Sequence, residues 1–183
     1  MNCIRVLVDE DFGLKSIPFN NPRTRMGARG IIKNEGKIAL FNKANKNEYK
    51  LPGGGIDEGE NPYEAFKREA LEETGCEIEI EDLIGTIEEH KSLDNFKQTS
   101  YIFVAHVTNN NHQLNLTQKE KDEGAKLIWV DINEALKLIS DCYENLKASE
   151  YENLYHSKFI VTRDKYILEY YIKKEKEKNV RTK

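Results

Sequence analysis

The sequence predicts an α/β fold in which a mixed β-sheet lies between helices. Short runs typical of strands occur both before and after a strongly capped helix at residues 62–74. A second run with helical spacing, at residues 157–178, closes the chain. The 183 residues are enough for one sizeable core, so we expect a single domain over residues 1–183.

The elements follow in order along the chain. The N-terminal arm, residues 1–25, contains an alternating stretch at residues 4–8 that predicts an extra edge strand without a functional role. Apolar runs on either side of Lys33-Asn34-Glu35-Gly36 predict a β-hairpin. The remaining predicted strands are at residues 49–51, 77–80, 83–87, 99–107 and 126–130.

The helix at residues 62–74 carries its start and stop signals in the sequence. Asn61 is a good N-cap, Pro62 suits the first helical position, and Glu64 stands where it can bond back to the cap backbone. Gly75 can adopt the left-handed conformation that ends a helix. At about 100° per residue, Tyr63 and Phe66 fall on one stripe that should face a core.

Three carboxylates lie on a neighbouring arc of the same helix. Glu69, Glu72 and Glu73 have the spacing i, i+3, i+4, so their charges repel one another unless a cation binds between them. Convergent carboxylate oxygens suit Mg²⁺, with Mn²⁺ as a substitute. The helix therefore predicts a divalent metal site.

The stretch from Gly54 to Cys76 resembles the signature of the Nudix hydrolases, the family of the MutT-like enzymes. That signature is Gly, five residues, Glu, seven residues, Arg-Glu, an apolar residue, any residue, Glu-Glu, any residue, Gly and an apolar residue. All seven fixed positions match, and chance agreement is on the order of 10⁻⁸ per window. These positions are Gly54, Glu60, Arg68, Glu69, Glu72, Glu73 and Gly75.

The resemblance implies a fold and a reaction. From about residue 28 to residue 138 the order of elements is similar to the Nudix α/β/α sandwich. The family hydrolyses a diphosphate linkage with the help of divalent metals, usually in a nucleoside diphosphate joined to another group. The resemblance places Glu69, Glu72 and Glu73 around the metal, with the Gly53 carbonyl as a further ligand. It also implies that Arg68 and Glu60 pair to fix the loop against the helix.

The remaining site residues are less specific in the sequence. The family often adds an acid from a loop before the late strand. Here Glu123 is preferred, then Glu120, with Asp122 as a third candidate and a solvated charged loop as the alternative. Substrate contacts are expected from Gly54, Arg29 and Lys50. The alternative for Arg29 and Lys50 is an ordinary charged residue on the solvated face of a strand.

Composition restricts the partners. Charged residues make up 33% of the chain and the net charge is −4, which argues against a duplex-DNA binder but permits a small nucleotide. No apolar run approaches the roughly 18 residues that a membrane span needs. Three scattered cysteines suggest reduced thiols and a cytoplasmic protein. A homodimer is compatible with the family.

Three functional hypotheses follow. The first is a Mg²⁺-dependent pyrophosphohydrolase acting on a small nucleotide. The second is a non-catalytic Nudix-fold binding or sensor module, which would usually have a degraded signature. The third is an RNA 5′-end pyrophosphohydrolase, which would need a basic track. In the family, loops outside the signature choose the substrate, and here these are residues 42–48, 90–98 and 108–124.

Overall fold

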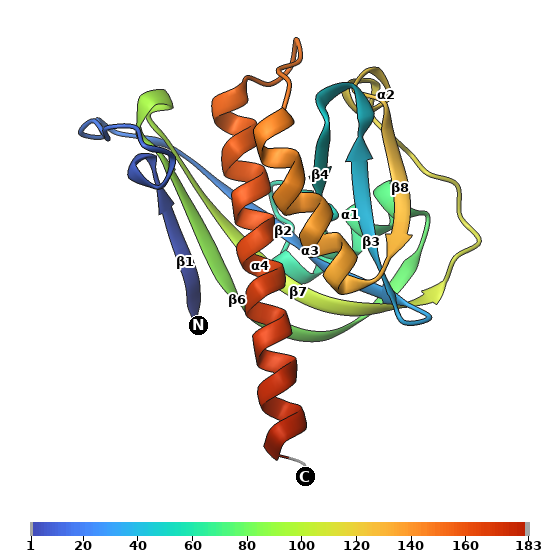
Figure 1. Cartoon of the computed structure of the whole chain (residues 1–183). Helices are drawn as coiled ribbons and strands as arrows, with labels where there is room; N and C mark the ends of the chain where they lie inside the picture. Colours follow the sequence, from blue (N-terminus) through green and yellow to red (C-terminus); the bar gives the residue numbers. More distant parts are fainter. Residues whose placement is uncertain (1, 182–183) are drawn as a thin grey trace.

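The computed structural model describes residues 2–181 and contains an eight-stranded sheet with helices on both faces (Figure 1). The strands are β1 (Cys3–Val8), β2 (Arg23–Asn34), β3 (Lys37–Lys43), β4 (Glu48–Lys50), β5 (Gly53–Gly55), β6 (Glu77–Lys91), β7 (Phe96–Asn109) and β8 (Ala125–Val130). The helices are α1 (Pro62–Thr74), α2 (Gln118–Asp122), α3 (Ile132–Cys142) and α4 (Leu154–Arg181).

The sheet is mixed, as predicted. Its strand order is β1-β6-β7-β2-β3-β4, with β5 added to β2 and β8 added to β3. β1 runs parallel to β6 and β2 runs parallel to β7, while the other pairs are antiparallel. The long strand β2 joins three neighbours. It pairs with β7 from Arg23 to Lys33, with β5 at residues 27–29 and with β3 at its last two residues. It therefore fixes the glycine-rich strand β5 to the centre of the sheet.

Each face of the sheet has its own apolar core because apolar side chains alternate along the strands. On the α1 face, Phe66 stacks on Phe103 with ring centroids 5.2 Å apart. On the other face, α3 and α4 cover the sheet through residues such as Ile139, Ile167 and Leu168 (Figure 1). The result is the predicted layering of helix, sheet and helix.

Several boundaries differ from the predicted ones. β1 is an edge strand as expected, but β2 begins at Arg23, because this residue already pairs with Phe96 of β7. The end of the predicted arm is therefore part of the sheet. The C-terminal helix predicted at residues 157–178 is the longer α4.

The prediction that Tyr63 belongs to the core stripe of α1 is wrong. Tyr63 is 48% exposed, whereas Phe66 is fully buried. Tyr63 lies in the first turn of the helix and contacts Phe103 only at the ring edge. None of the helices within residues 2–181 is both long and apolar enough to cross a lipid bilayer.

Candidate active site

Both ends of α1 are fixed by the predicted contacts. The Asn61 side chain accepts hydrogen bonds from the backbone N–H groups of Tyr63 and Glu64, at 2.9 and 3.1 Å. Glu64 in turn accepts from the Asn61 backbone N–H at 3.1 Å, which completes a capping box. Gly75 ends the helix with a φ of 65°. The helix that carries the acids is therefore held in place at its own ends.

Arg68 joins this helix to the preceding loop. Its guanidinium donates to both carboxylate oxygens of Glu60, each at 2.9 Å, and to the Gly55 carbonyl at 2.9 Å. The expected Arg68–Glu60 pair is present in this bidentate form, and Arg68 lowers the pKa of Glu60. A third group, the Glu69 carboxylate, accepts from Arg68 Nη1 at 2.9 Å.

Glu69 and Glu73 face the same cavity from successive turns of α1. Glu73 is almost fully buried and accepts from Lys50 Nζ at 2.9 Å and from the Gly53 backbone N–H at 2.7 Å. Burial alone would lower the pKa of Lys50, but the Glu73 carboxylate outweighs it and raises that pKa. Burial raises the pKa of Glu69, against the opposing effect of Arg68.

Glu72 does not line the cavity. Its side chain is 39% exposed and lies 3.4 Å from Arg68 Nη1. Within residues 2–181, no group of three or more His, Cys, Asp or Glu side chains is close enough to hold a metal ion. The three carboxylates therefore do not converge as the helical arc alone suggested. Glu73 pairs with Lys50, while Glu69 and Glu72 share Arg68, so two cations face three acids. Their role as metal ligands stays a prediction.

The glycines of β5 bring the backbone close to these acids. A Cβ on Gly54 would lie 2.3 Å from Oε1 of Glu69, so only glycine leaves this carboxylate its position. Gly53 has a φ of 135°, and a Cβ there would lie 2.4 Å from the Ala28 carbonyl oxygen. Gly53 and Gly54 both line the cavity. The loop thus supplies close backbone atoms at the point where the two acids meet.

The residues present have the donor set that Mg²⁺ prefers. Glu69, Glu73 and Glu120 offer carboxylate oxygens toward one cavity, which Gly53 also lines. An ionised carboxylate has about four acceptor positions, so the two hydrogen bonds on Glu73 leave it capacity for a metal. A divalent cation also fits the charge of two acids on adjacent turns.

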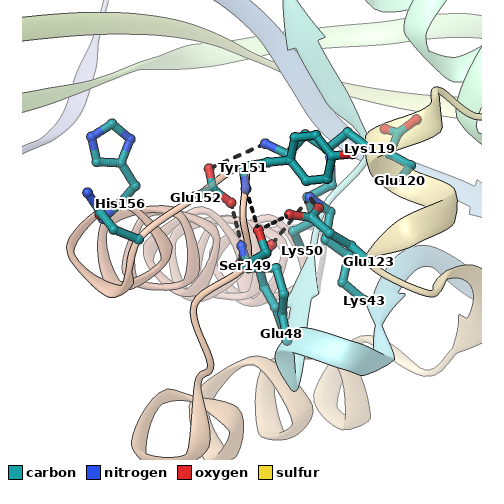
Figure 2. A network of polar contacts seen from close by, with 12 residues as sticks. Lys43, Glu48, Lys50, Lys119, Glu120, Glu123, Ser149, Tyr151, Glu152 and His156 are labelled. Carbon is teal, nitrogen blue, oxygen red and sulfur yellow. Dashed lines mark hydrogen bonds and ion pairs between the residues drawn. The ribbon is translucent and has the colours of Figure 1, made fainter.

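The candidate loop acids lie in different surroundings. The segment predicted as a loop at residues 108–124 contains α2. Thr117 is the N-cap of this helix, and the Glu120 carboxylate accepts from the Thr117 backbone N–H at 2.8 Å. Glu120 lines the cavity, and Glu123 does not. Glu123 is almost fully buried and accepts from Lys43 Nζ and Ser149 Oγ, each at 2.7 Å. Figure 2 shows Glu123 pointing toward Lys43 and Ser149.

Asp122, the third candidate, is bonded to Tyr151 and Gln118 outside the cavity. The sequence-based order of preference therefore differs from the placement of the side chains. Glu120 is the acid of this segment that faces the other site residues.

A buried ionic network lies beside α2 at the edge of the cavity (Figure 2). Lys46 is fully buried and pairs with Glu48 at 2.7 Å and with Glu152. Burial alone would raise the pKa of Glu152, but Lys46 outweighs it and lowers that pKa to about 2. Lys119 lies 3.9 Å from Glu152. Segments more than 100 residues apart in sequence are therefore held together beside α2.

The cavity has a volume of about 490 Å³ and carries more positive than negative groups. Each of the three segments expected to choose the substrate contributes to its lining, for example through Lys43, Phe96 and Lys119. Lys and Arg side chains outnumber carboxylates in the lining by eight to four. They are Arg23, Arg25, Arg29, Lys43, Lys50, Lys91, Lys119 and Arg163, against Glu69, Glu73, Glu120 and Glu152.

Arg29 and Lys50, expected near the glycine loop, are both buried and line this cavity. Arg29 pairs in register with Gly53 and donates from Nε to Ser100 Oγ at 3.2 Å. Burial and the neighbouring Arg163 lower the pKa of Arg29 to about 10. Neither residue is an ordinary charge on a solvated strand face.

Sequence reasoning missed several basic residues of the lining, notably Arg23, Arg25, Lys91 and Arg163. The first two stand at alternate positions with Arg29, so a period of two along β2 was a usable signal. Arg163 carries no such signal, because its position within an amphipathic helix does not show which groups of the sheet it meets.

The chain resembles known proteins of one family. The family model described as "NUDIX domain" matches residues 23–177. The chain is 28% identical over 114 residues to the nucleoside diphosphate-linked moiety X motif 6 protein of Xenopus laevis, covering 60% of this chain and 51% of that protein. It is 33% identical over 105 residues to a putative 8-oxo-dGTP diphosphatase of Bacillus subtilis, covering 57% of this chain and 64% of that one.

Other relatives differ in their named activity. An RNA pyrophosphohydrolase of Bartonella quintana is 35% identical over 77 residues, which is 37% of this chain and 42% of that protein. The chain thus spans about half the length of the curated relatives it matches. Among solved structures, a Nudix hydrolase from Nitrosomonas europaea has the same fold, with a TM-score of 0.52, 19% identity and coverage of 68% of this chain and 92% of that one. With a family match over residues 23–177 and the complete signature at residues 54–76, the chain belongs to the Nudix family.

Proposed function

We propose that this chain is a Mg²⁺-dependent pyrophosphohydrolase that cleaves a diphosphate linkage in a small nucleotide. The observation that carries the proposal is that Glu69 and Glu73 face one basic cavity together with the glycine backbone of β5. Its relatives include proteins named as diphosphatases and pyrophosphohydrolases. The complete signature favours an enzyme over a binding module. The free cysteines fit a cytoplasmic location.

The chain's own residues would divide the work between binding and positioning. When bound, the metal would neutralise the phosphates and lower the pKa of an attacking water. Glu69 and Glu73 would hold it, with the Gly53 carbonyl beside them. Glu120 lines the same cavity and would join them by a side-chain movement, because no three acids lie close enough together within the described residues. Arg68 and Glu60 would keep Glu69 and β5 at a fixed separation, because their bidentate pair joins helix and loop.

The phosphates themselves need positive partners. Arg29 and Lys50 would attract the diphosphate into the inner cavity, where burial strengthens the interaction of unlike charges. Gly54 would let the substrate approach the backbone closely. Glu72 would act indirectly, through its contact with Arg68. We further propose that residues 1–183 act as one domain, since strands from β1 to β8 share one sheet.

The proposal is tested with a panel of nucleoside triphosphates, sugar nucleotides and dinucleoside polyphosphates in Mg²⁺. At least one compound should be hydrolysed, EDTA should abolish the reaction, and added Mg²⁺ should restore it. Glu73→Gln should lower kcat by about 100-fold or more, because it removes a charged ligand. Glu58→Gln is the matched control, since Glu58 is an exposed acid in the loop between β5 and α1.

Two results would contradict the proposal. The first is the absence of turnover with every diphosphate compound. The second is a Glu73→Gln variant as active as the wild type. Tight nucleotide binding without hydrolysis would instead support the binding-module hypothesis.

A further inference from the structure

Three arginines form a row along one face of β2. Arg23, Arg25 and Arg29 stand at positions that share a side of the strand, and all three line the cavity. Arg23 and Arg25 are exposed at the rim, whereas Arg29 is buried. The row therefore leads from solvent toward β5 and the acids of α1.

None of these three arginines forms a salt bridge with a carboxylate of residues 2–181, and only the buried Arg29 interacts at longer range with acids, namely Asp164, Glu89 and Glu73. The salt bridges of this region use other groups: Glu89 pairs with Lys91 and Arg163, and Asp164 pairs with Arg163. The Arg23 guanidinium instead lies over the Phe96 ring, with 5.5 Å between its central carbon and the ring centroid. The rim arginines Arg23 and Arg25 thus carry positive charge that no carboxylate of the described residues pairs with.

Arg163 supplies an independent observation. It is 2% exposed, lines the same cavity from α4, and its Nη2 atom is buried without a hydrogen-bond partner among the described residues. An unsatisfied buried donor on a cation is costly unless an acceptor occupies the adjacent space. The inner end of the row, near Arg29 and Arg163, therefore suits an anionic group.

The outer end is a separate position. Residues four apart on a strand are about 13 Å apart, which is the separation of the Arg25 and Arg29 backbones along β2. Arg23 and Arg25 are only about 6.5 Å apart along the strand, so both guanidinium groups can reach one anion. A phosphate monoester carries close to two negative charges at pH 7, which matches two unpaired arginines.

We propose that the substrate carries a second phosphate group, separate from the diphosphate that is cleaved, and that Arg23 and Arg25 bind it. The proposal rests on the proposed function for its account of the inner cavity. The substrate class is a nucleoside diphosphate derivative with a further phosphate monoester on its sugar. Phe96, beside Arg23, provides an aromatic surface at the same end of the cavity.

A binding experiment without metal tests the second position directly. Isothermal titration calorimetry in EDTA compares adenosine 5′-monophosphate with adenosine 2′,5′- and 3′,5′-bisphosphate, which add one phosphate. The wild type should bind at least one bisphosphate about tenfold more tightly than the monophosphate. The ratio of bisphosphate to monophosphate affinity should fall to near one in the double variant Arg23→Gln/Arg25→Gln. It should be largely regained in Arg23→Lys/Arg25→Lys.

Lys97→Gln is the matched control. Lys97 is a basic residue one position after Phe96 on β7, it does not line the cavity, and its Nζ lies over the Phe19 ring instead. Removing its charge should leave the preference unchanged. Equal affinity of the wild type for all three nucleotides, no binding of either bisphosphate, or a preference that survives the double glutamine substitution would overturn the inference.

A turnover experiment separates this inference from the proposed function. ADP-ribose is compared with its 2′-phosphate, and dephospho-coenzyme A with coenzyme A, all with Mg²⁺. The phosphorylated member of at least one pair should have the lower KM in the wild type, and the double glutamine variant should abolish the difference. Hydrolysis of both members of every pair with equal KM would overturn the second phosphate site alone. No hydrolysis of any diphosphate, with the bisphosphate preference intact, would overturn the proposed function and leave the site standing.

Discussion

Replacing Glu89 by glutamine should destabilise the protein strongly, because this acid holds two buried cations. Glu89 is fully buried on β6. It accepts from Lys91 Nζ at 2.8 Å, from Gln98 Nε2 at 3.0 Å and from Arg163 Nη1 at 3.1 Å. Glutamine keeps the shape of the side chain but removes the charge. Lys91 then has no salt bridge left within residues 2–181, and Arg163 keeps only its salt bridge with Asp164.

The magnitude follows from the pKa of Glu89. Burial alone would raise it, but Arg163 and Lys91 outweigh burial and lower it from 4.5 to about 2. At 1.36 kcal/mol per pKa unit, this difference corresponds to about 3 kcal/mol of folding free energy at pH 7. Breaking a buried ion pair by removing one partner costs a similar 3–5 kcal/mol, roughly.

The pH dependence has a definite sign. Because the pKa is lower in the folded state, the unfolded state binds protons first, and the stabilisation is complete above about pH 4.5. It is lost as the pH falls toward 2. The difference between wild type and Glu89→Gln should therefore shrink by about 2 kcal/mol between pH 7 and pH 3.

Urea unfolding followed by the fluorescence of Trp129 measures this difference. Trp129 is the single tryptophan and lies partly buried in β8. The midpoints and slopes give the free energy of unfolding at each pH. The reasoning is refuted if the variant lies within about 1 kcal/mol of the wild type at pH 7, or if the difference is the same at pH 3.

Three further predictions concern the site and its helix. Gly54→Ala should lower kcat by about 100-fold with an unchanged circular dichroism spectrum, because its Cβ displaces the Glu69 carboxylate; wild-type kcat would contradict this. Glu120→Gln should lower kcat/KM by about tenfold at unchanged stability, whereas Glu123→Gln should cost about 3 kcal/mol of stability through Lys43. Both variants are measured by kinetics and urea unfolding. A loss of stability in Glu120→Gln together with a loss of kcat/KM alone in Glu123→Gln would disprove these roles. Asn61→Ala should cost about 1 kcal/mol in the same unfolding assay, and no loss would show that the cap is dispensable.

The sequence predicts the part of the site that local chemistry determines. Asn61, Pro62 and Gly75 act within one helix, so their spacing is enough to place both ends of α1. The family signature adds the Arg68–Glu60 pair, whose two members lie eight residues apart. These features are local, and the structure has them as expected.

Other features depend on segments that are distant in sequence. Residues 42–48 were predicted as a polar loop, yet Lys46 and Glu48 are fully buried there. Their burial depends on Glu152, which is 106 residues after Lys46. The sequence analysis preferred Glu123 to Glu120 as a metal ligand, and only the position of Lys43 shows that Glu123 is already paired. The sequence alone cannot reveal such pairs, because it does not show whether a charged side chain is solvated or paired with a side chain from a distant segment.

The late arrival of α4 has a consequence for synthesis of the protein. Arg163 bonds to Glu89 across 74 residues, and Asp164 accepts from the Leu51 backbone N–H across 113 residues. At ribosomal speeds of about 5–20 residues per second, these 74 residues take roughly 4–15 s to make. During this time Glu89 and Lys91 lie on a sheet face that lacks its covering helix. Nascent chains therefore cannot complete the cavity before α4 leaves the ribosome, because His156, Ile160 and Arg163 of this helix line it.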